Sequence, residues 1–194
     1  TLFPYTTLFR SELSDIGIPM VGEDQYTGAC RAVRHLVQSG HRQIWHVAGS
    51  QDWFDERRRM EGWKDTLELQ GLGAGKMLQA SWSPKSAYEI VMDTDFSHCP
   101  DAMFVASDHM AMAVIAALTS KGLRVPDDIS IVGFDDAEGT AYVTPPLTTV
   151  KQNLPAVARK AVSLLVSVIE GKPVDMVTMM NSELVIRSST KDKR

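Results

Sequence analysis

The sequence predicts an α/β protein built on a parallel β-sheet with helices on both faces. Short apolar or β-branched runs alternate with longer segments of helical periodicity through most of the chain. Such alternation is typical of strand–helix–strand crossovers between parallel strands. The chain has 194 residues, of which 44% are hydrophobic, so it can bury a sizeable core in one or two globular domains.

The predicted elements follow one another from Ile16 onward. Helices are predicted because apolar residues recur at three- and four-residue spacing, and four of them end at a glycine, which tolerates the left-handed conformation after a last helical turn. The predicted strands are 18–21, 43–47, 76–80, 102–106, 129–133 and 183–186. The predicted helices are 26–37, 55–70, 84–93, 108–121 and 154–169. A long loop is expected at 134–148.

The stretch 123–136 combines a turn, a buried strand and a charged strand end. Pro126 and the aspartates after it mark the turn, and 129–132 is a run of mainly β-branched apolar residues. Asp135 and Asp136 follow at the carboxyl end of this strand. In open α/β sheets, ligands bind outside the carboxyl ends of the parallel strands, so we expect the functional site at this edge.

Composition argues against several classes of function. The formal net charge is −4, which offers no basic surface for nucleic acid, and no apolar run approaches the length of a membrane helix. No secretory signal is visible, and Cys30 and Cys99 lack the spacing of a disulfide framework or redox motif. These features favour a cytoplasmic protein with reduced thiols.

Catalytic and metal motifs are also lacking in the sequence. Ser107, Asp108 and His109 are triad residue types, but consecutive side chains on a helix do not face one another, and there is no G-x-S-x-G motif. His35, His41 and His46 lack metal-ligand spacing and are expected to be surface or packed residues. We therefore predict no enzyme activity, no catalytic residues, no metal and no cofactor.

Several motifs resemble those of the LacI/GalR family of bacterial transcription regulators. They are GHRQIWHVAG at 40–49, RRMEGW at 58–63, FVASDHMAMAV at 104–114, GLRVPDDISIVGFDD at 122–136 and PPLTTVKQ at 145–152. The resemblance covers roughly 18–190. It implies a type I periplasmic-binding-protein-like fold of two lobes.

The resemblance also implies a division of the chain. Residues 12–190 would be an effector-binding domain fragment, with about 24–152 and 182–190 forming a nearly complete C-terminal lobe and about 153–181 a returning segment of a mostly missing N-terminal lobe. Residues 191–194 would be a tail. We interpret 1–11 as a non-native leader, because these residues fit neither the periodicity nor the family.

Arg59, Trp82 and Asp135 are the main candidate ligand-binding residues. Arg59 falls on the effector-binding arginine of the family motif, where composition alone would suggest a solvated helix face like that of Arg57. Trp82 stands between a strand and a helix, where the resemblance implies an aromatic residue lying against the effector. It could cover a sugar ring or a purine, or it could pack in the core. Asp135 could accept hydrogen bonds from adjacent hydroxyls, or it could serve as a cap or form a turn with Asp136.

Three further candidates are Ser107, Asp55 and Gln152. Ser107 stands where most family members have Asn, and both it and Asp108 could simply cap the next helix. Asp55 lies four residues before Arg59, on the same helical face, and could orient it or touch a ligand. Gln152 is a candidate for the hinge or the pocket rim.

The function that the resemblance implies is ligand sensing. The domain would bind a small carbohydrate and control DNA binding by a helix-turn-helix headpiece outside this chain, in a homodimeric repressor. The alternative is a periplasmic sugar-binding protein of the ribose-binding type. The motifs PPLTTV and GHRQI resemble those of the repressors, which favours the repressor over the transport protein.

Overall fold

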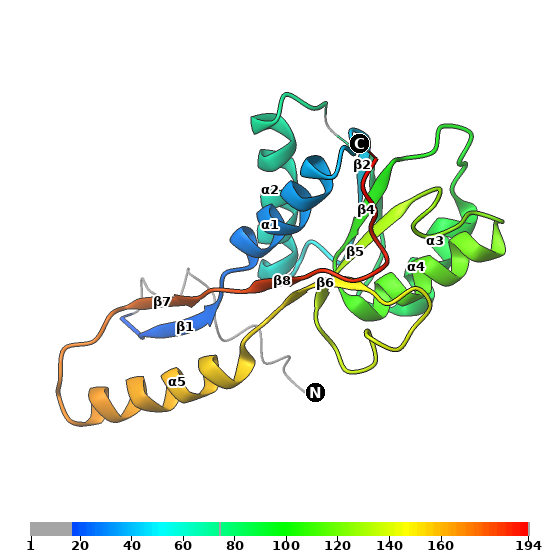
Figure 1. Ribbon diagram of the computed structural model, residues 1–194. Helices are drawn as coiled ribbons and strands as arrows, with labels where there is room; N and C mark the ends of the chain where they lie inside the picture. Colours follow the sequence, from blue (N-terminus) through cyan, green and yellow to red (C-terminus); the bar gives the residue numbers. More distant parts are fainter. Residues whose placement is uncertain (1–16, 74, 194) are drawn as a thin grey trace.

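The computed structural model describes residues 17–73 and 75–193, and its main body is a six-stranded sheet of order β3-β2-β4-β5-β6-β8 (Figure 1). The first five strands run parallel, as predicted, whereas β8 pairs antiparallel with β6 at the edge. The strands are β2 (Ile44–Ala48), β3 (Met77–Gln79), β4 (Ala102–Val105), β5 (Ser130–Asp135), β6 (Thr148–Lys151) and β8 (Glu183–Val185).

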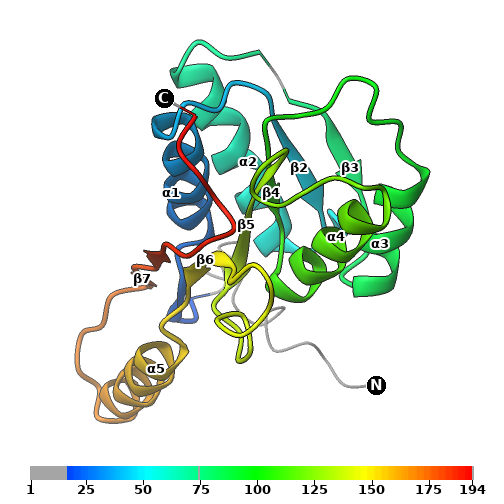
Figure 2. The same cartoon turned by 45° about the vertical axis from the view of Figure 1, so that its right-hand side comes forward.

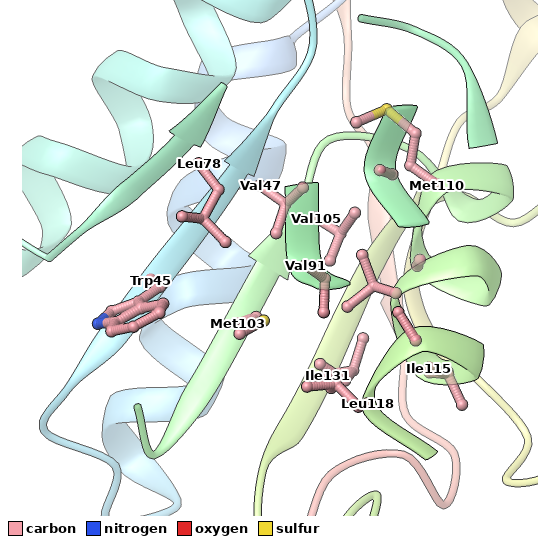
Figure 3. Close-up of a cluster of buried hydrophobic side chains, with 14 of the residues drawn as sticks. Trp45, Val47, Leu78, Val91, Met103, Val105, Met110, Ile115, Leu118 and Ile131 are labelled. Atoms are coloured by element: carbon pink, nitrogen blue, oxygen red, sulfur yellow. The ribbon is translucent and has the colours of Figure 1, made fainter. Parts of the chain in front are cut away.

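Two pairs of helices cover the two faces of this sheet (Figure 2). Helices α1 (Gln25–Gln38) and α2 (Phe54–Leu69) pack together on one face, and α3 (Pro84–Asp93) and α4 (Asp108–Ser120) on the other. Each face has its own buried apolar cluster, and Figure 3 shows the one beneath α3 and α4, with Val91 and Leu118 facing Met103 and Ile131. The predicted α/β class with helices on both faces is therefore confirmed.

Local chemistry explains where several helices begin and end. The Asp24 carboxylate accepts a hydrogen bond from the Thr27 N–H at 2.9 Å and so caps the first turn of α1. Pro84 occupies the first turn of α3, where its missing N–H costs nothing. Beyond α1, Gly40 has a φ of +93°, a conformation in which a side chain would be strained.

A smaller part of the molecule lies beyond one end of this body (Figure 1). It consists of the parallel pair β1 (Met20–Glu23) and β7 (Val177–Met180), with α5 (Leu154–Ile169) packed beside β1. The only α5 residue classed as buried is Leu164. Exposed apolar side chains on α5 are Leu154, Val162, Leu165, Val166, Val168 and Ile169.

Within the described ranges, the chain passes between the two parts three times. The crossings lie at Asp24, at 152–153 and at 181–182, between the elements that flank them. The lobe boundaries inferred from the sequence remain a prediction, and the interpretation of 1–11 as a leader falls outside the described residues.

Candidate functional site

A cavity of about 270 Å³ lies where the six-stranded sheet meets the smaller part of the molecule. Most of its wall comes from segments that follow the carboxyl ends of parallel strands, which is the position expected for ligand binding in an α/β sheet. Its remaining wall comes from β1, α5 and β7. The structure brings all six candidates from the sequence to this one cavity: Asp55, Arg59, Trp82, Ser107, Asp135 and Gln152.

Arg59 is the buried cation of the cavity. Only 3% of it is exposed, so a solvated helix face is the wrong interpretation. Its Nε donates to Gln25 Oε1 at 2.9 Å, its Nη1 donates to the Ala106 carbonyl, and its Nη2 lies 3.6 Å from Asp135 Oδ1. The guanidinium carbon sits 3.8 Å from the centre of the Phe134 ring. These contacts fix the guanidinium in one position, which preorganises it for a ligand.

Asp135 and Gln152 complete a ring of polar contacts with Arg59 and Gln25. The Gln152 amide donates to Asp135 Oδ1 at 2.5 Å, and the Gln25 amide donates to Gln152 Oε1 at 3.4 Å. Burial raises the pKa of Asp135, while Arg59 and Gln152 oppose that rise. Asp135 also has a φ of +122°, a conformation rare for a side-chain-bearing residue and often found at functional sites.

Asp136, the next residue, faces a different partner. Its Oδ1 lies 2.6 Å from Arg187 Nη2, and the hydroxyl of Thr140 is within 3.5 Å of the same oxygen. The two consecutive carboxylates are therefore divided between the cavity and the loop that follows β5. A simple turn formed by both is not what the structure contains.

Trp82 lies against the backbone of Gly49, close enough that a Cβ at that glycine would stand 2.7 Å from the indole. Trp53 meets it edge to face, with the ring centroids 6.1 Å apart. Trp53 and Phe54 also line the cavity, so its wall contains three aromatic residues. Sequence reasoning missed these two, although their place at the start of α2, shortly after the carboxyl end of β2, is a usable signal.

Asp55 lines the cavity on the same helix as Arg59. Burial raises the pKa of this carboxyl, the charge of Arg59 lowers it, and the charge of Asp135 raises it. The three groups therefore interact electrostatically across the cavity wall.

Ser107 and Asp108 have different roles. Ser107 caps α4 by accepting a hydrogen bond from the Met110 N–H at 3.4 Å, and it also lines the cavity. Asp108 is fully buried and caps nothing, which corrects the alternative considered above. Its carboxylate accepts hydrogen bonds from the Thr149 hydroxyl at 2.6 Å and the Ala137 N–H at 2.8 Å, tying β6 and the loop after β5 to α4.

Glu23 also lines the cavity and was not anticipated from the sequence. It ends β1 and is 8% exposed. One carboxylate oxygen accepts the Asn153 N–H, while the other, Oε2, is buried with no hydrogen-bond partner among the described residues. Burial raises the pKa of this carboxyl, the Asn153 N–H lowers it, and Asp24 raises it.

The buried histidine His46 supports the start of α2. Its Nε2 lies 2.7 Å from Glu56 Oε1, its Nδ1 lies 3.0 Å from the Phe104 carbonyl, and Glu56 accepts the Gly49 N–H at 2.8 Å. His46 is thus a packed residue, as expected. No group of three or more His, Cys, Asp or Glu side chains suited to a metal ion occurs within 17–73 and 75–193.

The fold is that of an α/β domain with a cavity between its two parts. Residues 33–190 match the family model described as "Periplasmic binding protein-like domain", and the chain belongs to that family. Within it, the resemblance to the LacI/GalR regulators is confirmed by the relatives below.

The curated relatives include transcriptional repressors. The chain is 32% identical over 179 residues to the HTH-type transcriptional repressor PurR of Haemophilus influenzae (strain PittEE), covering 89% of this chain and 53% of that protein. It is 35% identical over 164 residues to the lactose operon repressor of Escherichia coli (strain K12), covering 84% and 46%. The chain therefore spans about half the length of the curated relatives it matches.

Solved structures of the same kind have a similar fold. The lac repressor dimer bound to operator and the anti-inducer ONPF superposes with a TM-score of 0.85 at 33% identity, over 89% of this chain and 60% of that one. A complex of the transcriptional regulator CelR with cellobiose gives a TM-score of 0.83 at 29% identity, over 89% and 54%. None of the helices in the described part of the chain is long and apolar enough to cross a membrane.

Proposed function

We propose that this chain is the effector-binding part of a LacI/GalR-type transcriptional repressor and that its cavity binds a small carbohydrate. The observation that supports this most directly is that buried Arg59 and partly exposed Asp135 lie at one cavity, beside the aromatic wall of Trp53 and Trp82. A cation, a carboxylate and flat apolar faces are the groups that recognise a ring bearing several hydroxyls.

Each group has a distinct role in this proposal. Arg59 donates hydrogen bonds to ligand oxygens, Asp135 accepts them from adjacent hydroxyls, and Trp82 covers an apolar C–H face of the ring. Asp55, Ser107 and Gln152 complete the polar wall. No bond of the ligand needs to be broken, so the function is binding and not catalysis.

The cavity wall suggests how binding is signalled. Glu23, Val157 and Met179 come from the smaller part of the molecule, and Arg59 and Asp135 come from the main body. A ligand that contacts residues of both parts binds one relative arrangement of the parts more tightly than another. Binding then shifts the population of molecules toward that arrangement, to an extent set by the difference in affinity. This gives a route from effector binding to a DNA-binding headpiece outside this chain.

The relatives support further parts of the proposal, namely the oligomeric state, DNA binding and location of the full-length protein. Lac repressor was solved as a dimer bound to operator, which supports a homodimeric regulator acting on DNA in the cytoplasm. A periplasmic sugar-binding protein of the ribose-binding type has the same kind of fold, but the repressors named above favour the regulatory role. Sequencing the complete gene separates the two: a helix-turn-helix segment supports the repressor, and a signal peptide supports the transport protein.

Calorimetry on the full-length gene product tests the ligand class and the residue roles. A panel of monosaccharides, disaccharides, purines and amino acids should give binding to a carbohydrate. Arg59→Ala and Asp135→Ala should each weaken it by about 10- to 150-fold, because a buried charge-assisted hydrogen bond contributes about 1.5–3 kcal/mol. Trp82→Ala should weaken it to a similar degree through lost contact area.

Arg58→Ala is the matched control for Arg59→Ala. The Arg58 side chain is 40% exposed and pairs with Glu61 on the same helix, so its loss should leave affinity within a few-fold of the wild type. Arg57, expected from the sequence to be solvated, is less suitable because it donates to the Gln51 and Asp52 carbonyls beside the cavity. Tight binding of a purine in place of any sugar would contradict the carbohydrate proposal.

A further inference from the structure

Glu23 holds a buried carboxylate oxygen that has no hydrogen-bond partner within residues 17–73 and 75–193. The residue is 8% exposed, and its Oε2 is buried without a hydrogen bond among the described residues. Leaving a buried carboxylate oxygen unpaired is costly unless another molecule satisfies it. Since Glu23 lines the cavity, that molecule can be the ligand.

The other oxygen of Glu23 fixes the carboxylate in place. It accepts the N–H of Asn153, the residue that caps α5 through a hydrogen bond from Ala156 N–H. A carboxylate held at one oxygen presents the second in a defined direction. This arrangement is suited to reading one donor group on a ligand.

The charges that line the cavity are predominantly negative. Glu23, Asp55 and Asp135 contribute three carboxyl groups, whereas Arg59 is the single Lys or Arg among the described residues that line it. Asp135 Oδ1, 3.6 Å from Arg59 Nη2, already offsets part of the positive charge of Arg59, although the guanidinium keeps N–H groups that can donate to a ligand. An additional phosphate or carboxylate on a ligand would therefore meet net repulsion at short range.

We propose that Glu23 is a specificity-determining residue of this cavity, that its free oxygen accepts a hydrogen bond from a ligand hydroxyl or ammonium group, and that the site selects uncharged or amino sugars over sugar phosphates and sugar acids. This inference rests on the proposed carbohydrate function and narrows it to a class of ligand.

The test is calorimetry of the full-length gene product against matched sugars. The panel contains glucose, galactose, lactose and cellobiose as uncharged probes, glucosamine and galactosamine as amino sugars, and glucose 6-phosphate and gluconate as anions. The best uncharged or amino sugar should bind at least about tenfold more tightly than either anion. Glu23→Gln should weaken that best ligand by about 10- to 150-fold, because it removes the charged acceptor.

Glu68→Gln is the control, since Glu68 is an exposed residue of α2 and the variant makes the same change in charge. It should leave every affinity unchanged. Thermal unfolding of the unliganded variants shows whether Glu23→Gln remains folded. If it does not, the wild-type preference between uncharged and anionic sugars still decides the inference.

The outcomes distinguish the two proposals. Sugar binding that favours the anions, or that Glu23→Gln leaves unchanged, overturns the role of Glu23 while the carbohydrate function stands. Failure of every sugar to bind overturns the carbohydrate function, and the inference that rests on it falls with it.

Discussion

The side chains of three consecutive arginines on α2 lie in three different environments. Arg59 is buried at the cavity, Arg58 pairs with Glu61, and Arg57 binds loop carbonyls. Helical periodicity explains the difference, because the buried residues of α2 after Arg59 are Gly62, Trp63, Thr66 and Leu67, spaced as one face of a helix. The sequence could therefore have singled out Arg59 without any family motif.

Glu23 could not be found this way, since its burial depends on a contact with Asn153, 130 positions further along the chain.

Asp108 should make stability depend on pH. Burial is the largest cause that raises its pKa, from 3.8 to about 7, and the charges of Asp135 and Asp136 add to the rise. An acid with a raised pKa binds more protons in the folded state, so its contribution to the free energy of unfolding falls as pH rises from about 4 to about 7. The fall is at most about 4 kcal/mol, at about 1.36 kcal/mol per pKa unit.

Denaturant unfolding of Asp108→Asn at pH 4, 6 and 8 checks this. The variant cannot titrate, so the stability advantage of the wild type over it should shrink as pH rises. The exposed Asp93→Asn provides the comparison and should leave the pH dependence unchanged. A constant difference between wild type and Asp108→Asn across this range would show that Asp108 does not titrate there.

At the scale of elements, the predicted helices and most strands were found within about two residues, while β6 and β7 were missed. Strand β6 begins Thr148-Thr149, which looks polar in sequence, yet both threonines are buried and bonded, one to Asp108 and the other to the last segment of the chain. Strand β7 alternates exposed and intermediate residues, and among the described strands it pairs with β1 alone. Neither strand has the continuous apolar run by which buried parallel strands are recognised.

Helix α5 should limit the solubility of the 194-residue chain. Its apolar side chains Val162, Leu165 and Ile169 are 60–75% exposed, and such surface promotes association. The double variant Val162→Gln/Leu165→Gln should reduce self-association in sedimentation experiments with little change in melting temperature. Leu164→Gln, one residue away but 8% exposed, should instead destabilise the fold by roughly 2–5 kcal/mol. A wild-type chain that stays monomeric at high concentration would contradict this expectation.

For the whole molecule, the charge predicts how the chain behaves toward DNA. It has 20 Lys and Arg residues against 24 Asp and Glu residues, and binding to phosphates requires a positive surface. The 194-residue chain should therefore give no sub-micromolar shift of operator-containing DNA even at low salt, where nonspecific binding is strongest. The full-length gene product, on the same DNA and in the same buffer, should bind. A clear shift by the 194-residue chain alone would place a DNA-binding surface within it.

The three crossings at 24, 152–153 and 181–182 also determine how the gene can be divided. Neither part of the molecule is one uninterrupted stretch of codons. The elements from α1 to β6 separate β1 from α5 and β7, and β8 returns to the larger sheet after β7. A protease that cuts at any single crossing leaves the two parts joined by the other two. A deletion or exchange that removes one part intact must take out two separate segments of the described chain. For this molecule, the unit that can be moved to another protein is the pair of parts together with the cavity between them.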